Sequence, residues 1–310
     1  MNEFELISIL RASLPTNASV QVGAGDDCAV IDLGLADQFI LFKTDAVVEG
    51  IHFTKATPAE KIGRKALARC LSDIAAMAGT PKAALVTIAL PHTFDGEFIQ
   101  AVYRGINTLA AEHDTAIVGG ETTTNPERML ISVALLGTVA KDKCLLRSGA
   151  KAGDAVFVTG TLGGSGAGKH LDFEPRLTEA RWLAQHFSIH SMIDLSDGLA
   201  GDLPHILKAS GVGAEIFSDA IPIDRTARMQ AKAETSAKSP LLAALTDGED
   251  FELLFTLASK YAVPLLDAWK EKFSALPLSC IGKITPTPGL RIRNKKGVQP
   301  VTAHGYTHFA

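Results

Sequence analysis

The 310-residue sequence lacks the marks of several large classes of protein. Its four cysteines are widely spaced, without a C-x-x-C pair or a histidine at zinc-finger spacing, which argues against a zinc site and a disulfide framework. Its net charge is -4, so it lacks the excess of lysine and arginine with which proteins bind a nucleic-acid backbone. Its apolar stretches, including residues 83–90 and 129–140, are too short to cross a bilayer, and its first residues are acidic where a signal peptide is basic. We therefore expect a cytoplasmic protein without a nucleic-acid or membrane partner.

The sequence also lacks a complete P-loop. The glycine-rich segment 159–170 comes close, since Gly163, Gly168 and Lys169 have the required spacing. However, His170 stands where the motif needs a hydroxyl group for magnesium. We therefore expect this loop to pack tightly or to approach a ligand through its backbone.

The apolar pattern predicts an α/β (α+β) protein of two domains, residues 1–148 and residues 149–310, divided at a small and polar segment. In the first domain, strands are expected at 38–42, 83–90, 116–118 and 128–140. Helices are expected at 57–78, with Thr57 as its cap, and at 94–112. In the second domain, strands are expected at 155–158, 192–193 and 251–257, helices at 199–209 and up to residue 269, and a surface loop at 230–239.

Acidic residues recur at glycine-containing junctions beside the expected strand ends. For each one alone, the more common explanation is a solvated turn or, at Ser196 and Asp197, a cap of the helix that follows. The recurrence favours a shared use, and it involves Asp26 with Asp27, Asp45, Glu121, Asp194 with Asp197, and Glu249 with Asp250. Asp73 lies on an expected helix, where Arg69 one turn away is an alternative ion-pair partner. Because each Mg²⁺ is held by one or two carboxylates, waters and substrate phosphates, dispersed acids indicate several Mg²⁺ ions around a polyphosphate.

The same segments, in the same order, resemble the signature motifs of the thiamine-monophosphate kinases. This family belongs to an ATP-binding superfamily with aminoimidazole ribonucleotide synthetase, selenophosphate synthetase and a hydrogenase-maturation protein. The resemblance covers nearly the whole chain, and its motifs are residues 25–29, 44–45 with 50–53, 71–77, 119–123, 147–150, 193–198 and 248–253. Each motif alone is weak, whereas all of them in this order are highly specific.

The resemblance implies direct in-line transfer of the γ-phosphoryl group of ATP to thiamine monophosphate, without a catalytic side chain, because the acceptor phosphate is already an anion. It implies several Mg²⁺ ions bound by Asp27, Thr44, Asp45, Asp73, Glu121, Asp194 and Asp197. It implies nucleotide contacts from Gly120, Arg147 and Ser196, and substrate contacts from His52, Glu249 and Tyr306. Members of the family are homodimers through their N-terminal domains, and some also use a monovalent cation such as K⁺.

The chain departs from the family pattern at several positions. Lys43 stands where the family usually has a small hydroxyl residue, and we hypothesise that its ammonium group replaces part of the charge of the magnesium ion that touches that hydroxyl. Glu121 replaces an aspartate and is one methylene longer, so its metal contact is expected to shift or to pass through water. Asp247 and Gly166 replace a common glycine and a common alanine, and mild effects are expected.

Two other functions are compatible with this pattern. An enzyme of the same superfamily could phosphorylate another acceptor, although the match at 248–250 and the absence of a selenophosphate-type cysteine near the N-terminus argue against it. The other alternative is a nucleotide-binding scaffold without turnover, and Lys43 and Glu121 are its only indications.

Of the two adjacent acids that open the chain's first motif, Asp27 is expected to be the better metal ligand and Asp26 a supporting or second one, because adjacent side chains on extended backbone point opposite ways.

Overall fold

A computed structural model describes residues 3–233, 238–302 and 305–306 of the chain. The chain forms two compact units. We call Ser19–Cys144 with Leu171–Thr178 the N-terminal unit, and Met1–Ala18 with Leu145–His170 and Glu179–Ala310 the C-terminal unit. Each unit has its own mixed sheet with helices, so the expected α/β fold is confirmed. Within the described residues, no helix combines the length and the apolarity needed to span a membrane.

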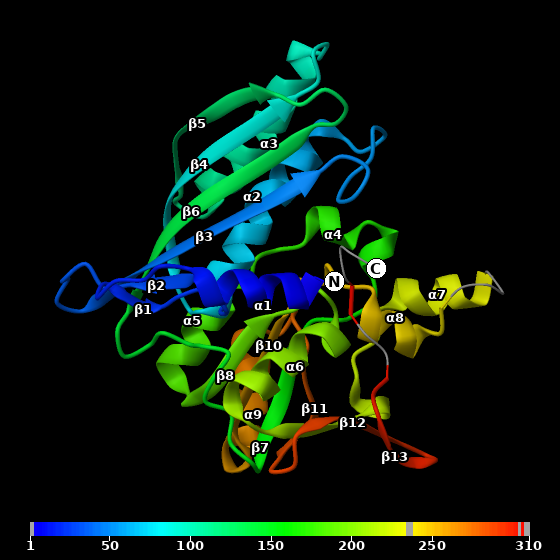
Figure 1. Ribbon diagram of the computed structural model, residues 1–310. Coiled ribbons are helices and arrows are strands. Elements are labelled where there is room, and N and C mark those ends of the chain that lie inside the picture. The colour runs from blue at the N-terminus through cyan, green and yellow to red at the C-terminus, as the bar shows by residue number, and fades with distance from the viewer. Residues whose placement is uncertain (1–2, 234–237, 303–304, 307–310) are drawn as a thin grey trace. The chain divides into compact units, whose positions relative to one another are not determined.

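The N-terminal unit is built on a six-stranded sheet in the order β1-β2-β3-β6-β4-β5. The strands are β1 (Val20–Val22), β2 (Ala29–Ile31), β3 (Gln38–Val48), β4 (Thr80–Leu90), β5 (Ala116–Thr124) and β6 (Leu130–Ala140). Neighbouring strands are antiparallel except β4 and β5, which are parallel. Helices α2 (Ala59–Ala76) and α3 (Gly96–Glu112) cover one face of this sheet (Figure 1). The opposite face carries exposed Phe42, Leu85 and Leu136.

Two glycines let helices α2 and α3 approach each other closely. Gly63 on α2 lies against the backbone of Val102, and Gly105 on α3 lies against the backbone of Glu60. A Cβ atom at either glycine would overlap the facing carbonyl oxygen. The two helices are therefore in backbone contact, and this contact holds α2, which carries Asp73, in place on the sheet.

Two strands are longer than the sequence predicts. β3 continues to Val48, because it pairs with β6 along its whole length. β5 continues to Thr124, because it stays paired in parallel with β4. The prediction that Asp45 and Glu121 lie at the ends of strands is therefore wrong, since both lie within strands.

The start of α2 also differs from the predicted threonine cap. Pro58 is the N-cap residue, and no side chain caps the helix. The hydroxyl of Thr57 instead accepts a hydrogen bond of 3.0 Å from the amide of Thr54. The hydroxyl is thus used in the preceding turn, and the helix ends at Ala76, two residues earlier than expected.

The C-terminal unit is built on a seven-stranded sheet in the order β13-β12-β9-β11-β7-β10-β8. Its strands are β7 (Asp154–Thr159), β8 (Ile189–Asp194), β9 (Gly213–Phe217), β10 (Leu253–Ala258), β11 (Leu278–Thr285), β12 (Gly289–Asn294) and β13 (Gly297–Pro300). Besides α2 and α3, the α-helices of the described residues are α1 (Glu3–Ser13), α4 (Lys169–Asp172), α5 (Leu177–His186), α6 (Leu199–Ser210), α7 (Arg225–Ala233), α8 (Pro240–Thr246) and α9 (Ala262–Lys272).

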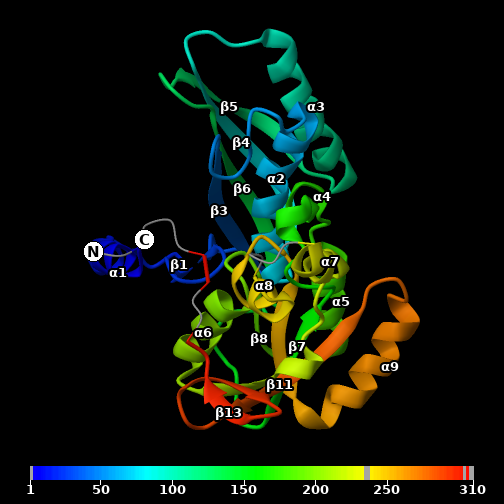
Figure 2. The same ribbon diagram turned by 90° about the vertical axis from the view of Figure 1, so that its right-hand side faces the viewer.

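The two faces of this second sheet have cores of different composition. On one face, aliphatic side chains of α6, such as Leu203 and Ile206, form a cluster with Val156 and Val158 of β7. On the other face Phe157 stacks on Phe255, and Trp182 of α5 meets Trp269 of α9 edge to face. Figure 2 shows α6 and α9 on opposite sides of the sheet. The strand β7 is consequently buried along its entire length.

Two expected boundaries in the C-terminal unit are wrong. Strand β10 begins at Leu253 instead of residue 251, because Phe251 adopts a left-handed conformation with a φ of 50°. Helix α7 extends to Ala233 and so occupies the first part of the surface loop expected at 230–239. Residues 234–237 of that expected loop lie outside the described residues.

Candidate functional site

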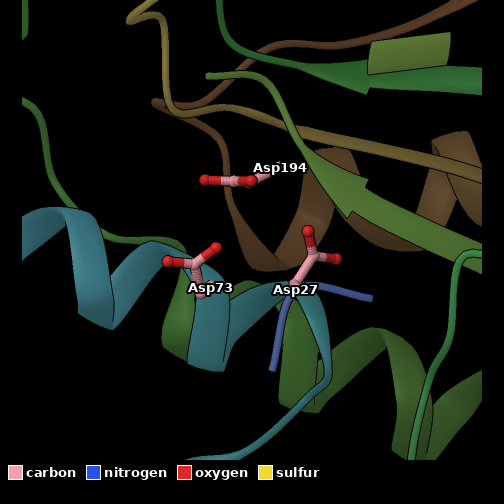
Figure 3. A group of neighbouring side chains, drawn as sticks. All are labelled: Asp27, Asp73 and Asp194. Atoms are coloured by element: carbon pink, nitrogen blue, oxygen red, sulfur yellow. The ribbon is translucent and has the colours of Figure 1, made fainter. Parts of the chain in front are cut away.

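Two buried carboxylates of the N-terminal unit lie close together. Asp27 precedes β2 and is 1% exposed, and Asp73 lies in the last turn of α2 and is 6% exposed. Each offers a carboxylate oxygen, and these oxygens lie within 4.8 Å of each other (Figure 3). Asp26 has a local role, because its Oδ1 accepts a hydrogen bond of 3.0 Å from the amide of Asp27. Hard oxygen donors at this spacing suit Mg²⁺.

Strand β3 places Lys43, Thr44 and Asp45, which lie within it, on two different faces of the sheet. Successive side chains on a strand point to opposite faces. Lys43 and Asp45 point toward α2, where the Nζ of Lys43 lies 3.0 Å from Asp73 and Asp45 lies 3.5 Å from the guanidinium of Arg69. Thr44 points to the exposed face, where its hydroxyl lies 3.4 Å from that of Ser132 on β6. The structure therefore brings Asp45 to the side of Asp73 and places Thr44 on the other side.

His52 is held at its ring and at its backbone. The amide of Val48 donates a hydrogen bond of 3.1 Å to the Nδ1 of His52, so the neutral ring carries its proton on Nε2. The ammonium group of Lys65, a residue of α2 that is 0% exposed, donates to the carbonyl oxygen of His52 at 2.7 Å. The ring is thus fixed as an Nε2–H donor, which is the form that can hydrogen-bond an anion.

Replacing Lys65 by methionine is expected to lower the free energy of unfolding by about 1–3 kcal/mol, because it removes a buried donor from the carbonyl of His52. Unfolding by urea measures this change. Lys61→Met, one turn earlier on α2, is the matched control, since Lys61 pairs with Asp172 at the surface and its loss is expected to cost at most about 1 kcal/mol. Equal losses in the two variants would contradict a structural role for the buried lysine.

Gly120 and Glu121 lie far from these acids along the sheet. Both belong to β5, an edge strand, which is separated from β3 by β4 and β6. Three strand spacings amount to about 14 Å. A Cβ atom at Gly120 would overlap the carbonyl oxygen of Val86, so only glycine fits there. Within one chain, the structure does not bring Glu121 to the pair of Asp27 and Asp73.

In the C-terminal unit, three separate segments come together at the end of β8. The segment 194–198 is tied to the segment 247–251, because the amide of Glu249 donates to the carbonyl of Ser196 at 2.7 Å. The amide of Tyr306 donates to the carbonyl of Asp197 at 3.0 Å, so the end of the chain joins them. Asp194, labelled in Figure 3, is buried at the end of β8. The structure therefore brings these five predicted site residues together.

The helix-cap interpretation of Ser196 and Asp197 is wrong. The N-cap of α6 is Gly198, and no side chain caps the helix. The amide of Asp197 instead donates to the buried carboxylate of Asp202 at 2.9 Å. Burial and the nearby carboxylates of Asp197 and Asp194 raise the pKa of Asp202, and Arg147 is close enough to lower it. Asp202 and Arg147 thus belong to the same group of charges.

The glycine-rich loop after β7 packs tightly against other parts of its own unit, as one of its two expected roles requires. The amide of Gly163 lies 3.0 Å from both carboxylate oxygens of Asp250. Lys169 donates to the carbonyl of Thr161 at 2.5 Å and to Glu252 at 3.2 Å. The lysine that would bind phosphate in a P-loop is therefore engaged within the loop.

Glu249 lies beside this loop in a strained conformation. Its φ of 52° is rare for a residue with a side chain, and such strain is often stored at functional sites. The Nδ1 atom of His170 lies 3.2 Å from its carboxylate. The backbone of Glu249 is thus fixed by its hydrogen bond to Ser196, while its side chain is half-buried next to a histidine.

Replacing Asp250 by asparagine is expected to change how stability depends on pH. Burial raises the pKa of the Asp250 carboxyl to about 7, against an ordinary value of 3.8. The folded protein therefore binds more protons than the unfolded protein between about pH 4 and pH 7, and wild-type stability falls as pH rises through this window. Relative to wild type, the variant is expected to gain up to about 1.4 kcal/mol per pH unit there.

Urea unfolding of both proteins at about pH 5 and about pH 8 measures this difference. Asp247→Asn is the matched control, because this acid of the same loop pairs with Lys238 near the surface. A constant difference between Asp250→Asn and wild type across this pH range would show that Asp250 does not titrate as described.

Several residues of the site carry no sequence signal that identifies them. Lys65 and Asp202 are charged residues that are almost fully buried, and nothing in their neighbours distinguishes them from surface charges. Gly305 is similar, because its close approach to Gly201 depends on the path of the chain end.

Comparison with known proteins defines first the class and then the family. Residues 25–139 match the family model "AIR synthase related protein, N-terminal domain", and residues 151–294 match "AIR synthase related protein, C-terminal domain". The two sheets and the acids at their strands thus belong to an AIR synthase-related protein. The chain is 39% identical to the thiamine-monophosphate kinase of Rhodopirellula baltica, over 99% of this chain and 97% of the relative. It is 33% identical to that of Bacillus subtilis, over 100% of both. The chain belongs to the thiamine-monophosphate kinase family.

Solved structures agree with this assignment. A structure described as AaThiL complexed with AMPPCP and TMP has a TM-score of 0.84 and 29% identity, covering 99% of this chain and 97% of that chain. The thiamine-monophosphate kinase of Stenotrophomonas maltophilia K279a has a TM-score of 0.74 and 32% identity, covering 94% and 96%. The family resemblance and the two-domain fold expected from the sequence are both confirmed.

Proposed function

We propose that this chain transfers the γ-phosphoryl group of ATP to thiamine monophosphate, giving thiamine diphosphate and ADP. The observation that carries the proposal is the buried pair of Asp27 and Asp73, with oxygens within 4.8 Å of each other. This pair occurs in a chain that is 39% identical to a thiamine-monophosphate kinase over nearly its full length. A relative of similar fold is described as complexed with AMPPCP and TMP. Four free cysteines fit a reducing cytoplasm, where we place the enzyme.

The proposal divides the work between the two parts of the chain. Residues 1–148 bind ATP and Mg²⁺ and form the dimer, and residues 149–310 complete the nucleotide and substrate site. The proposed ligands of Mg²⁺ are Asp27, Thr44, Asp45, Asp73, Glu121, Asp194 and Asp197. The enzyme is also proposed to use K⁺ as a monovalent cation. When bound, Mg²⁺ neutralises charge on the phosphoryl group and its leaving group. Asp27, Asp73 and Asp194 suit it best, because they are buried carboxylates.

The nucleotide is held by groups that suit phosphate oxygens. Arg147 offers a planar fork of donors, and its charge lies near the acids at the end of β8. Ser196 offers a hydroxyl from the segment that its hydrogen bond to Glu249 fixes. Gly120 lets the backbone of β5 approach a ligand, because it has no side chain. These groups position the γ-phosphoryl group without taking part in bond making.

The acceptor is held by groups of both signs. The Nε2–H of His52 donates to the phosphate of thiamine monophosphate, in the tautomer that Val48 fixes. The carboxylate of Glu249 complements the cationic thiazolium ring or hydrogen-bonds the pyrimidine. Tyr306, whose side chain is exposed, closes over the substrate. No side chain serves as a general base, because the attacking phosphate oxygen already carries negative charge.

One assay tests the activity. The protein is incubated with MgATP and thiamine monophosphate, and thiamine diphosphate and ADP are measured in equal amounts over time. ATP binding without product would favour the scaffold, and phosphorylation of another acceptor alone would favour a different enzyme of the superfamily. Omission of Mg²⁺, with chelator present, is expected to abolish product formation.

We also propose a homodimer formed through the exposed face of the N-terminal sheet. Phe42, Leu85 and Leu136 are between 36% and 48% exposed there, on the face opposite α2 and α3. Large apolar side chains gathered on one sheet face commonly mark an interface. A mass measurement in solution tests the dimer, and Leu136→Glu is expected to shift it toward monomer.

The dimer gives Glu121 a use that its place in one chain does not. If Glu121 is a metal ligand, a partner copy supplies it, since about 14 Å separate β5 from β3. Mixing inactive Asp27→Asn and Glu121→Gln proteins, and letting their subunits exchange, is then expected to restore part of the activity. No recovery in exchanged dimers would contradict this arrangement.

A further inference from the structure

Lys43 brings a positive charge into the acids of the N-terminal unit. Its Nζ lies 3.0 Å from the Oδ1 of Asp73, with the side chains 23% and 8% exposed. Position 43 of β3 faces α2, and so does Asp45 two residues later, which lies 3.5 Å from Arg69. The strand thus fixes the side of the sheet on which the ammonium group lies, because turning Lys43 to the other face would also turn Asp45 away from Arg69.

The side chain of Lys43 is only partly exposed, so its ammonium group needs a nearby negative charge, and the carboxylate of Asp73 supplies it. A buried charge without compensation is strongly destabilising. Asp73 and Lys43 therefore stabilise each other when no metal ion is bound.

We propose that the ammonium group of Lys43 acts as a built-in substitute for a divalent cation at Asp73. As a result, the chain binds fewer Mg²⁺ ions at its N-terminal acids than their carboxylates alone would hold. Mg²⁺ requires six oxygen ligands at about 2.0–2.1 Å and gives up water reluctantly. An ammonium group 3.0 Å from Oδ1 takes up the space and the negative charge that such an ion needs. This inference rests on the proposed magnesium role of Asp27 and Asp73, and it does not depend on the acceptor.

The number of bound ions tests the substitution. Mn²⁺ replaces Mg²⁺ as the probe, and the ions bound per chain are counted by electron paramagnetic resonance with saturating AMPPCP. Lys43→Ser is expected to bind about one Mn²⁺ more than wild type, because it frees the ligand oxygen of Asp73. Lys43→Arg keeps the charge and is expected to bind the same number as wild type. Equal counts in wild type and Lys43→Ser would overturn the proposal.

A stability measurement provides a second test, with Lys43→Met as the variant that keeps an apolar stem. Without metal, this variant is expected to melt at a lower temperature than wild type, and Mg²⁺ is expected to restore most of the difference. Lys141→Met is the matched control, because Lys141 pairs with Asp32 at 2.9 Å in the same unit, and its loss offers Mg²⁺ no comparable place. Restoration in neither variant, or in both equally, would overturn the proposal.

These outcomes separate the inference from the proposed function. A wild-type protein that binds Mn²⁺ but forms no thiamine diphosphate would contradict the proposed acceptor and leave the role of Lys43 to the ion counts. A wild-type protein that forms thiamine diphosphate, together with equal ion counts in wild type and Lys43→Ser, would support the proposed function and overturn the inference about Lys43.

Discussion

Replacing Asp27 by asparagine is expected to lower Mg²⁺-dependent formation of thiamine diphosphate by about 10²–10³-fold or more, a loss typical of removing one preorganised group from a charged transition state. The carboxylate is almost fully buried next to Asp73, so solvent has little access to the place that it occupies. An asparagine keeps the size of the side chain and removes its negative charge. The initial rate at a series of Mg²⁺ concentrations measures the loss, and the concentration for half-maximal rate is expected to rise.

Asp32→Asn is the matched control for this experiment. Asp32 lies just after β2, only five residues from Asp27, but its carboxylate pairs with Lys141 near the surface. Its replacement is expected to leave the rate unchanged within about twofold, since surface ion pairs contribute little. Mg²⁺-dependent turnover that survives Asp27→Asn would show that the acid pair is not the metal site.

Replacing Gly63 by alanine is expected to lower the free energy of unfolding by at least about 2 kcal/mol. Alanine is the better helix former by about 1 kcal/mol, so helix propensity alone predicts stabilisation. The added methyl group, however, would overlap the carbonyl oxygen of Val102 on α3, and a backbone atom cannot move aside like a side chain. Overlap is therefore expected to outweigh propensity. Gly105→Ala, on the other helix, is expected to behave in the same way, because it faces the backbone of Glu60.

Gly96→Ala distinguishes this contact from a general effect of glycine. Gly96 is the first residue of α3, and a Cβ atom there would meet nothing within 4 Å. Its replacement is expected to leave stability unchanged or to raise it slightly, by less than about 1 kcal/mol. Urea unfolding of the three variants gives the comparison, and similar losses in all three would refute the importance of the α2–α3 contact.

The sequence predicts the fold class and most of the elements, because apolar periodicity reflects burial. Helices α3 and α6 and strands β4 and β6 lie within a few residues of their expected positions. The extensions of β3 and β5 could not be predicted, since pairing with β6 and β4 fixes their length. The hydrogen bond of Thr57 could not be predicted either, because its hydroxyl accepts from the amide of Thr54 in the preceding turn instead of from an amide at the start of α2.

The site could be predicted where the motif order identified a family, but the contacts of each residue could not. Asp27 and Asp73 are 46 positions apart in sequence, and only the packing of α2 against the sheet brings their oxygens together. The ion pair of Lys43 with Asp73 depends on which face of β3 position 43 occupies. The strand expected from the sequence ends at residue 42, so it does not predict that face.

The two cysteines beside the acid pair bear on which metals this site accepts. Burial raises the pKa of the Cys28 and Cys70 thiols, and the carboxylates of Asp73, Asp27 and Asp45 raise them further. A thiol must lose its proton to bind a soft metal ion well, and here that loss is costly. Zinc and copper ions therefore gain little from sulfur atoms that lie close to the carboxylates. The carboxylates that would attract a hard cation thus also keep these two thiols protonated, which disfavours a soft metal ion at the proposed site.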